Sequence, residues 1–424
     1  MKKIILSLSL IMLISLSLIG CNDSDGDGAH THAFGEWDIA VAAKCDADGL
    51  KTRACACGET EEEVIPAGHA PTDWKIMKNP TCTTAGERTR GCSMCGIVLD
   101  KETIPANGHE VAVYTYNNNA TLNRDGTATG KCSVCKKNAT IQVEGTSAQI
   151  KAAFEGKTFS VLGDSISTYL NVSNGDAADT TNSTIRDGVL YYDQQKIDDM
   201  GVTLNSTWWQ RTINSFGGSL LVNNSWSGSY IKDTSTNTRP TAGAYVSRAL
   251  NLHDDTGENA GEEPDIILIY MGTNDFYKYK SGCGSVNDYS SIPEKASSDY
   301  VPTSVAEAYA IMLYKISEKY KNAEIYCLNV LEGPSSDEYE LSYFNNMLKD
   351  VAQQYGAKYV DICEKSGIKN DSFYETYIPS DDGDGTKNTL HPNAAGMAKI
   401  SDCVINTIIE ESKFTPEFPQ TIEK

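Results

Sequence analysis

Five short apolar runs alternate with helix-like segments over the C-terminal three-fifths of this 424-residue chain, and this alternation constrains the fold more than any other feature. Unbroken apolar runs of this length are typical of parallel strands buried on both faces. Between two of the runs, Val305, Tyr309 and Met312 have the spacing of a helix with one buried face. We therefore predict a three-layer α/β/α domain over residues 146–413, with a five-stranded parallel sheet. The strands are expected at 158–163, 220–224, 265–272, 324–331 and 358–363.

A cysteine-rich repeat with a period of about 37 to 40 residues fills the region before this domain, residues 32–145. His32, His69 and His109 each precede an aromatic residue by five positions, which defines about three copies. The third copy has Leu122 where the first two have a cysteine, and atypical copies are common at the ends of arrays. We predict small, mostly β or irregular units here. After the α/β domain, residues 414–424 are expected to form a loose tail.

The repeat cysteines have two competing interpretations, a zinc site and disulfide bonds. Cys82, Cys92, Cys95 and His109 have the donor types of a closed tetrahedral zinc site, which would be structural. An exported protein can instead form disulfides, although three cysteines per copy would leave one thiol unpaired within a repeat. Both interpretations stay open from the sequence.

The N-terminus is predicted to be a lipoprotein signal peptide over residues 1–20. Two lysines precede an apolar run at 4–19, and Gly20-Cys21 follows. The run is short for a membrane-spanning helix, which needs about 20 apolar residues. Its end resembles the bacterial lipobox, which implies lipidation of Cys21 and an extracytoplasmic, membrane-anchored protein. Residues 21–31 are polar and predict a flexible spacer.

The composition argues against a nucleic-acid partner. Lys and Arg total 36 against 57 Asp and Glu, and the formal net charge of −21 repels phosphate backbones. Hydrophobic residues make up 40% of the chain, which is enough for a sizeable core and too much for a disordered protein.

Ser165 lies in a Gly-Asp-Ser turn directly after the first predicted strand, at the sheet edge where open α/β proteins bind ligands. A serine hydroxyl becomes a good nucleophile only when a base accepts its proton. The chain has 6 histidines. Three belong to the repeats, His30 to the spacer and His253 to a polar loop, which leaves His391 just before the last predicted helix.

Two further loops at the same edge offer hydrogen-bond donors for an oxyanion, which acyl transfer requires because charge develops on the carbonyl oxygen. The loop after the second strand contains Gly228, where the absence of a side chain lets a backbone N–H approach a ligand. The loop after the third strand contains Asn274, whose side-chain amide can donate into the same cleft.

Four motifs follow one another along the chain: the Gly-Asp-Ser turn, the Asn…Ser-Gly loop, the Gly-x-Asn-Asp loop and the late His-Pro pair. In this order they resemble the sequence blocks of SGNH (GDSL-type) serine hydrolases, over about residues 157–412. The resemblance implies Ser165 as nucleophile and His391 as general base. It implies an oxyanion hole made by the Ser165 backbone N–H, Gly228 and Asn274. It also implies a flavodoxin-like strand order of 2-1-3-4-5 and catalysis without a metal or other cofactor.

One position departs from the family pattern. The family usually has Asp three residues before the histidine, where it orients the imidazole, and this chain has Asn388. In the serine-protease triad the equivalent change costs about ten-thousandfold in rate. Either Asn388 or a backbone carbonyl orients His391, or Asp384 or one of its neighbours substitutes, or the enzyme is slow or inactive.

The resemblance and the leader together predict an extracytoplasmic serine esterase that hydrolyses small acyl esters through an acyl-serine intermediate. Acetyl esters of carbohydrates are the expected substrates, and the lipid anchor gives the contact with the membrane. A lipase is the near alternative, although the chain has no long apolar lid segment. From a different class, the protein would be a surface binding or adhesion lipoprotein whose repeats act and whose SGNH domain is weak or inactive.

Overall fold

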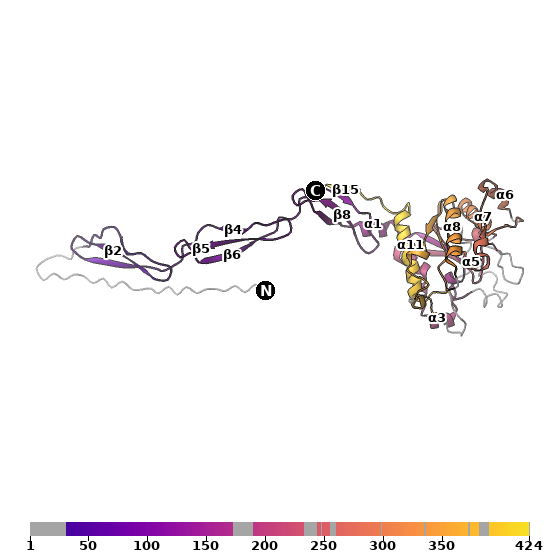
Figure 1. Cartoon of the computed structure of the whole chain (residues 1–424), viewed down its shortest axis with the longest axis horizontal. Coiled ribbons are helices and arrows are strands. Elements are labelled where there is room, and N and C mark those ends of the chain that lie inside the picture. Colours follow the sequence, from indigo (N-terminus) through magenta and orange to yellow (C-terminus); the bar gives the residue numbers. More distant parts are fainter. Residues whose placement is uncertain are drawn as a thin grey trace. The chain divides into compact units, whose positions relative to one another are not determined.

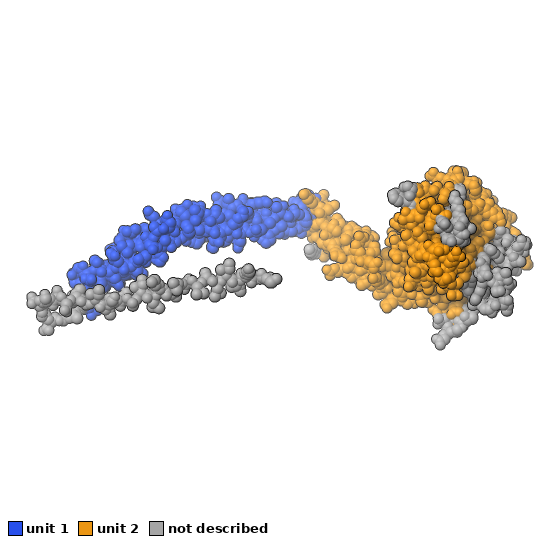
Figure 2. Space-filling model, turned by 90° about the horizontal axis from the view of Figure 1, so that it is seen from below, with its two compact units in different colours: residues 1–110, 132–136 blue, residues 111–131, 137–424 orange. Residues whose placement is uncertain are grey.

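The structure is a computed structural model that describes residues 31–172, 190–232, 244–246, 248–254, 260–297, 299–334, 336–371, 374–380 and 390–423. The predicted signal peptide and Cys21 lie outside these residues. The chain divides into two compact units, one of residues 1–110 and 132–136 and the other of residues 111–131 and 137–424 (Figure 2). None of the helices described is long and apolar enough to cross a membrane.

A five-stranded parallel sheet forms the centre of the larger unit, as predicted. Its strand order is β11-β10-β12-β13-β14, which is the expected order 2-1-3-4-5. The register pairs Gly163 at the end of β10 with Ser225 on one side and Tyr270 on the other, so the three carboxyl ends lie next to one another. The strands are β10 Thr158–Gly163, β11 Ser219–Ser225, β12 Ile266–Tyr270, β13 Glu324–Leu328 and β14 Lys358–Val360.

Helices cover both faces of this sheet and complete the predicted α/β/α architecture (Figure 1). Alternate residues of β12 enter opposite cores: Ile267 and Ile269 pack with α7 and α8, and Leu268 packs with α4 and α11. A central parallel strand is therefore apolar at every position. The helices described are α1 Thr146–Phe154, α3 Gln194–Met200, α4 Trp208–Phe216, α5 Thr273–Tyr279, α6 Ile292–Lys295, α7 Val305–Lys319, α8 Glu338–Gln354, α9 Ile362–Lys365, α10 Tyr374–Tyr377 and α11 Ala394–Glu411.

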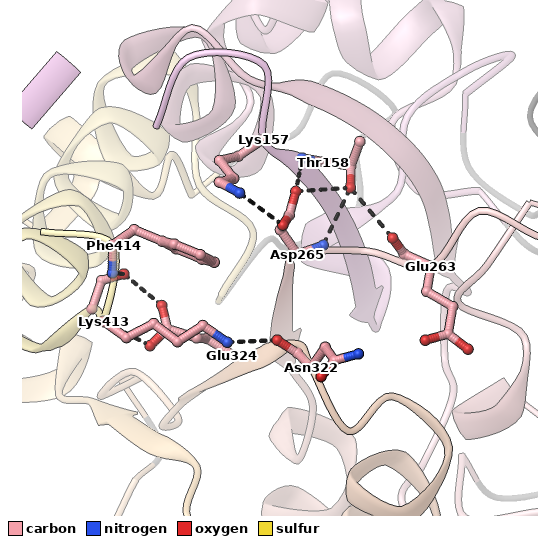
Figure 3. Close-up of polar contacts among 9 residues, drawn as sticks. Lys157, Thr158, Glu263, Asp265, Asn322, Glu324, Lys413 and Phe414 are labelled. Carbon is pink, nitrogen blue, oxygen red and sulfur yellow. Dashed lines mark hydrogen bonds and ion pairs between the residues drawn. The ribbon is translucent and has the colours of Figure 1, made fainter. Parts of the chain in front are cut away.

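Charged side chains fix the opposite, amino-terminal edge of the sheet (Figure 3). Asp265 accepts hydrogen bonds from the Lys157 ammonium and the Thr158 backbone N–H, both at 3.0 Å, and so joins β10 to the start of β12. Glu324, at the start of β13, accepts from the Lys413 backbone N–H at 2.9 Å. The two carboxylates thus tie neighbouring strands and the segment after α11 together.

Three small antiparallel sheets correspond to the three predicted repeats. The first contains β1 Asp38–Val41, β2 Gly49–Ala54 and β3 Thr60–Ile65, and the second contains β4 Lys75–Lys78, β5 Gly86–Gly91 and β6 Val98–Ile104. The third contains β7 Val113–Tyr116, β8 Gly126–Lys131 and β9 Asn138–Val143, with one further strand at its edge. The prediction of mostly β units is confirmed.

The further strand is β15 Thr421–Glu423, which pairs antiparallel with β7. The expectation of a loose C-terminal tail is therefore wrong. An aromatic contact accompanies this pairing, since the ring centroids of Phe418 and Tyr116 lie 5.5 Å apart. The Tyr116 N–H also donates to the Gln420 carbonyl at 2.9 Å.

Candidate active site

Ser165 and His391 meet at the carboxyl edge of the sheet although 226 positions separate them in sequence. Nε2 of His391 lies 2.8 Å from Oγ of Ser165. Ser165 begins a single 3₁₀ turn, Ser165–Ser167, directly after β10, and it is buried. His391 lies two residues before Asn393, whose side chain caps the first turn of α11 by accepting the Gly396 N–H.

The turn that carries Ser165 is fixed by its neighbours. Oδ1 of Asp164 accepts the Ile166 N–H at 3.1 Å, which caps the turn. A Cβ at Gly163 would lie 2.4 Å from the Ser167 side chain, so only glycine fits the end of β10. Asn223 donates to the Ser167 carbonyl at 3.0 Å and closes the turn from the side of β11.

The two predicted donor loops lie beside this turn. The Trp226 N–H donates to the Gly163 carbonyl at 3.1 Å, which ties the loop of Gly228 to the end of β10. Nδ2 of Asn274 donates to the Ser229 carbonyl at 2.9 Å, which joins that loop to α5. Gly228 has a φ of 69°, a conformation that favours glycine.

A buried carboxylate holds the second loop in place. Asp275 accepts the N–H groups of Ile231 at 2.7 Å and Lys232 at 3.1 Å. Burial raises the pKa of Asp275 to about 7, against the two backbone hydrogen bonds, which favour the ionised form. Asp275 therefore has a structural part in shaping the loop.

Arg248 is a site element that the sequence analysis missed. Its buried Nη2 donates to the carbonyls of Gly163 and Asn224, both at 2.6 Å, and so bridges the ends of β10 and β11. Burial raises the pKa of the neighbouring Asp164 to about 6, and the Arg248 charge opposes that rise. No motif marks Arg248, because it lies far along the chain from both strand ends.

Two consecutive tyrosines, Tyr191 and Tyr192, hold the segment that carries His391, and the sequence analysis did not predict them either. The Tyr191 ring stacks on the His391 imidazole, with centroids 3.4 Å apart and an interplanar angle of 11°. The buried Tyr192 hydroxyl donates to the Pro392 carbonyl at 2.7 Å. These contacts restrict the plane of the imidazole and the path of the backbone beside it. The candidates for a third member of the site, Asn388 and Asp384, lie outside the described residues.

The predicted zinc ligand set is wrong in its grouping. Cys82 and Cys92 belong to two different clusters of His and Cys side chains, because the loop of one repeat meets the turn of the next rather than its own. The clusters found among the described residues are Cys45, His69, Cys92 and Cys95; Cys82, His109, Cys132 and Cys135; and His32, Cys55 and Cys57. None of them lies in the α/β domain, where catalysis is expected.

Several known proteins are similar to this chain. The family model described as GDSL-like Lipase/Acylhydrolase matches residues 157–408. A protein from Bacteroides uniformis ATCC 8492, assigned as a GDSL-like lipase, is 21% identical with a TM-score of 0.39, over 60% of this chain and 97% of that one. A protein from Bacteroides ovatus ATCC 8483, also assigned as a GDSL-like lipase, is 24% identical with a TM-score of 0.36, over 61% of this chain and 100% of that one. Phospholipase A1 from Streptomyces albidoflavus NA297 is 14% identical with a TM-score of 0.36, over 59% of this chain and 99% of that one. No curated protein matches the chain.

Proposed function

Since this chain belongs to the GDSL-like lipase/acylhydrolase family and is therefore a serine ester hydrolase, we propose that Ser165 is its nucleophile and His391 its general base. The observation that carries the proposal is the 2.8 Å separation of Nε2 and Oγ. This is within the range that direct proton transfer between a nucleophile and its base requires.

In the proposed mechanism, Oγ of Ser165 attacks the ester carbonyl carbon while Nε2 of His391 takes the hydroxyl proton. The carbonyl oxygen becomes an oxyanion that the backbone N–H groups of Ser165 and Gly228 and the Asn274 amide stabilise. Collapse of the tetrahedral intermediate expels the alcohol, which takes the proton from the imidazolium. His391 then takes a proton from water as that water attacks the acyl-serine. The second tetrahedral intermediate collapses, the imidazolium returns the proton to Oγ of Ser165, and the carboxylic acid leaves.

The orienting partner of His391 must accept a hydrogen bond from Nδ1, because Nε2 faces Ser165. We assign this role to Asn388 or a backbone carbonyl, with Asp384 as the alternative. The Tyr191 ring supports a working arrangement without a carboxylate, since it already restricts the imidazole plane. Kinetics of Asn388→Asp and Asp384→Ala separate the choices: a loss of activity in Asp384→Ala alone identifies Asp384.

The proposed substrates are small acyl esters, with acetyl esters of carbohydrates first. The proposed location is extracytoplasmic, with the chain anchored through lipidated Cys21. The support for both is the N-terminal sequence and the family, because an exported esterase of this kind meets acylated polymers outside the cell. A series of p-nitrophenyl esters of increasing acyl length tests the first part, and it contradicts the proposal if long chains are preferred over acetate.

The central test compares the full chain with Ser165→Ala in the hydrolysis of p-nitrophenyl acetate. We expect the variant to fall to the background rate, and Ser215→Ala on α4 to match the unaltered protein. A fluorophosphonate should label Ser165, as located by peptide mass spectrometry, in the unaltered chain and in Ser215→Ala only. Equal turnover by Ser165→Ala and the unaltered chain would refute the assignment of the nucleophile.

A further inference from the structure

The first two repeats lack the apolar core that normally holds a folded unit together. Among the described residues, the two hydrophobic core clusters draw no member from residues 31–110. The buried positions in that stretch are two glycines and three cysteines, Gly49, Gly86, Cys55, Cys82 and Cys92. Small units of this kind usually need a disulfide or a structural metal for stability.

Surface contacts in the repeats are too weak to replace a core. Arg53 forms an ion pair with Glu61 and stacks over the Trp37 ring, with its guanidinium 4.5 Å from the ring centroid. The Arg53 and Glu61 side chains are about a third exposed. Exposed ion pairs contribute about 0–1 kcal/mol each. The buried cysteines are therefore the natural place to look for what stabilises the repeats.

The first four-residue cluster joins consecutive repeats. Cys45 comes from the loop between β1 and β2, His69 from the segment before β4, and Cys92 and Cys95 from the turn between β5 and β6. Sγ of Cys45 lies 3.4 Å from Sγ of Cys92, and Sγ of Cys95 lies 3.5 Å from Nδ1 of His69. The four donor atoms lie within 4.8 Å of one another.

The second cluster repeats this arrangement one period later. Cys82 comes from the loop between β4 and β5, His109 from the segment before β7, and Cys132 and Cys135 from the turn after β8. Sγ of Cys82 lies 3.9 Å from Sγ of Cys132, and Sγ of Cys135 lies 3.4 Å from Nδ1 of His109. In both clusters the histidine precedes its cysteine by 26 positions.

We propose that each of these clusters binds one structural Zn²⁺ ion through three cysteine sulfurs and one histidine Nδ1. Zn–S bonds of about 2.3 Å and Zn–N bonds of about 2.0–2.1 Å place tetrahedral sulfurs about 3.8 Å apart and sulfur and nitrogen about 3.6 Å apart. The two sulfur–sulfur and two sulfur–nitrogen distances in the clusters, at 3.4 to 3.9 Å, agree with both values. Binding converts the three thiols to thiolates and releases their protons to solvent.

Disulfide bonding accounts for less of this geometry. Three thiols in one cluster leave one without a partner, and a disulfide gives no reason for a histidine nitrogen at contact distance from a sulfur. Sulfur atoms in a disulfide lie about 2.04 Å apart, whereas Cys45 and Cys92 are separated by 3.4 Å. Soft thiolate donors with an imidazole are also the ligand set that Zn²⁺ prefers.

Leu122 supports the same assignment, because the loop cysteine is absent where no following repeat could supply the other ligands. It occupies the loop between β7 and β8, at the position that Cys45 and Cys82 hold in the first two copies. No later repeat follows it, and Leu122 instead packs in the apolar cluster that contains Ile150 and Phe154. In the third repeat an apolar side chain thus replaces the loop cysteine, because the surface that this loop contacts is apolar and not the turn of a further repeat.

The test is the zinc content of the full chain, purified with reductant and without chelator. We expect Cys92→Ser/Cys95→Ser and Cys132→Ser/Cys135→Ser each to lose one Zn²⁺ per chain relative to the unaltered protein. Met94→Ala, a change between two of the ligands at an exposed side chain, should lose none. Differences between variants are measured, so metal bound at His32, Cys55 and Cys57 does not affect the result.

A second variant keeps the proposal testable if the double variants misfold. His69→Cys should retain its metal, and in the Co²⁺-substituted protein it should increase the thiolate charge-transfer absorption, whereas His69→Ala should not. The helical circular dichroism reports separately that the α/β domain is folded. Zinc content unchanged in both double variants would overturn the proposal. So would a second preparation, purified without reductant, that is metal-free and whose repeat thiols resist alkylation until reductant is added, because that result identifies disulfides.

Discussion

Asn274 provides the sharpest test of the site, because its structural role predicts a small loss of stability and its catalytic role a much larger loss of activity. In the structure one N–H of the Asn274 amide donates to the Ser229 carbonyl at 2.9 Å. An amide nitrogen has two N–H groups, so one remains for an oxyanion. Asn274→Ala removes both. The lost bond to Ser229 should cost about 1 kcal/mol of stability, since the side chain is only half-buried and water can replace it.

The catalytic cost should be much larger. Loss of one oxyanion donor lowers kcat by about a hundred- to a thousandfold, or about 2.7–4 kcal/mol of transition-state stabilisation. KM should change little, because the donor acts on charge that develops only in the transition state. The assay is steady-state hydrolysis of p-nitrophenyl acetate, with urea unfolding of the same samples.

Asp275→Asn is the matched control, one residue further along α5. An amide can accept only one of the two N–H groups that Asp275 accepts, so we expect a stability loss of about 1–3 kcal/mol. Its loss of kcat per kcal/mol of lost stability should be far smaller than that of Asn274→Ala. The oxyanion assignment is refuted if Asn274→Ala keeps more than a tenth of the original kcat, or if both variants lose kcat in proportion to stability.

Three further outcomes follow from the structure. Tyr191→Ala should lower kcat by about two- to tenfold, since an aromatic pair contributes about 0.5–1.5 kcal/mol. Tyr191→Phe should keep the original kcat. An equal loss of kcat in both variants would contradict a role for the stacking of the Tyr191 ring on His391. Arg248→Met should lower the free energy of unfolding in urea by about 2–5 kcal/mol, because two carbonyls lose a charged donor; a change below about 0.5 kcal/mol would count against the bridge. Burial raises the pKa of Glu324, but hydrogen bonds from Lys358, the Lys413 backbone and Ser412 outweigh it and lower that pKa in the folded protein. The stability that ionised Glu324 contributes to the fold is therefore present above its unfolded-state pKa and is lost as pH falls through its folded-state pKa. Glu324→Gln should therefore reduce the acid dependence of thermal unfolding below about pH 4.5, and an unchanged pH profile would refute this.

The apolar pattern predicted all five strands of the large sheet, but the ends of three strands depended on contacts distant in sequence. The third strand stops at Tyr270 rather than Gly272, because Gly272, with a φ of 118°, is the N-cap residue of α5. The fourth stops at Leu328: the Asn329 N–H still donates to the Val360 carbonyl at 3.3 Å, but the Val330 N–H bonds to the Asn345 side chain instead of a strand. The fifth stops at Val360, because Asp361 caps α9.

The site was predictable as far as its chemistry is local. Ser165 was marked by its turn and His391 by elimination among few histidines, and the structure brings them together. Arg248 had no signal, because a guanidinium that bridges two carbonyls has no sequence spacing. The candidate metal ligands of the repeats were grouped wrongly because the period alone does not show that Cys45 lies beside the turn of the following copy.

The strand β15 has a consequence for the order in which the chain can fold. Its Ile422 pairs with Tyr114 of β7, so one edge of the third small sheet is closed by residues at the far end of the sequence. A chain that emerges from the ribosome amino end first cannot close that edge until the whole α/β domain has followed. The third repeat should thus finish folding last, and a chain cut short after α11 should expose the β7 edge to pairing with other chains.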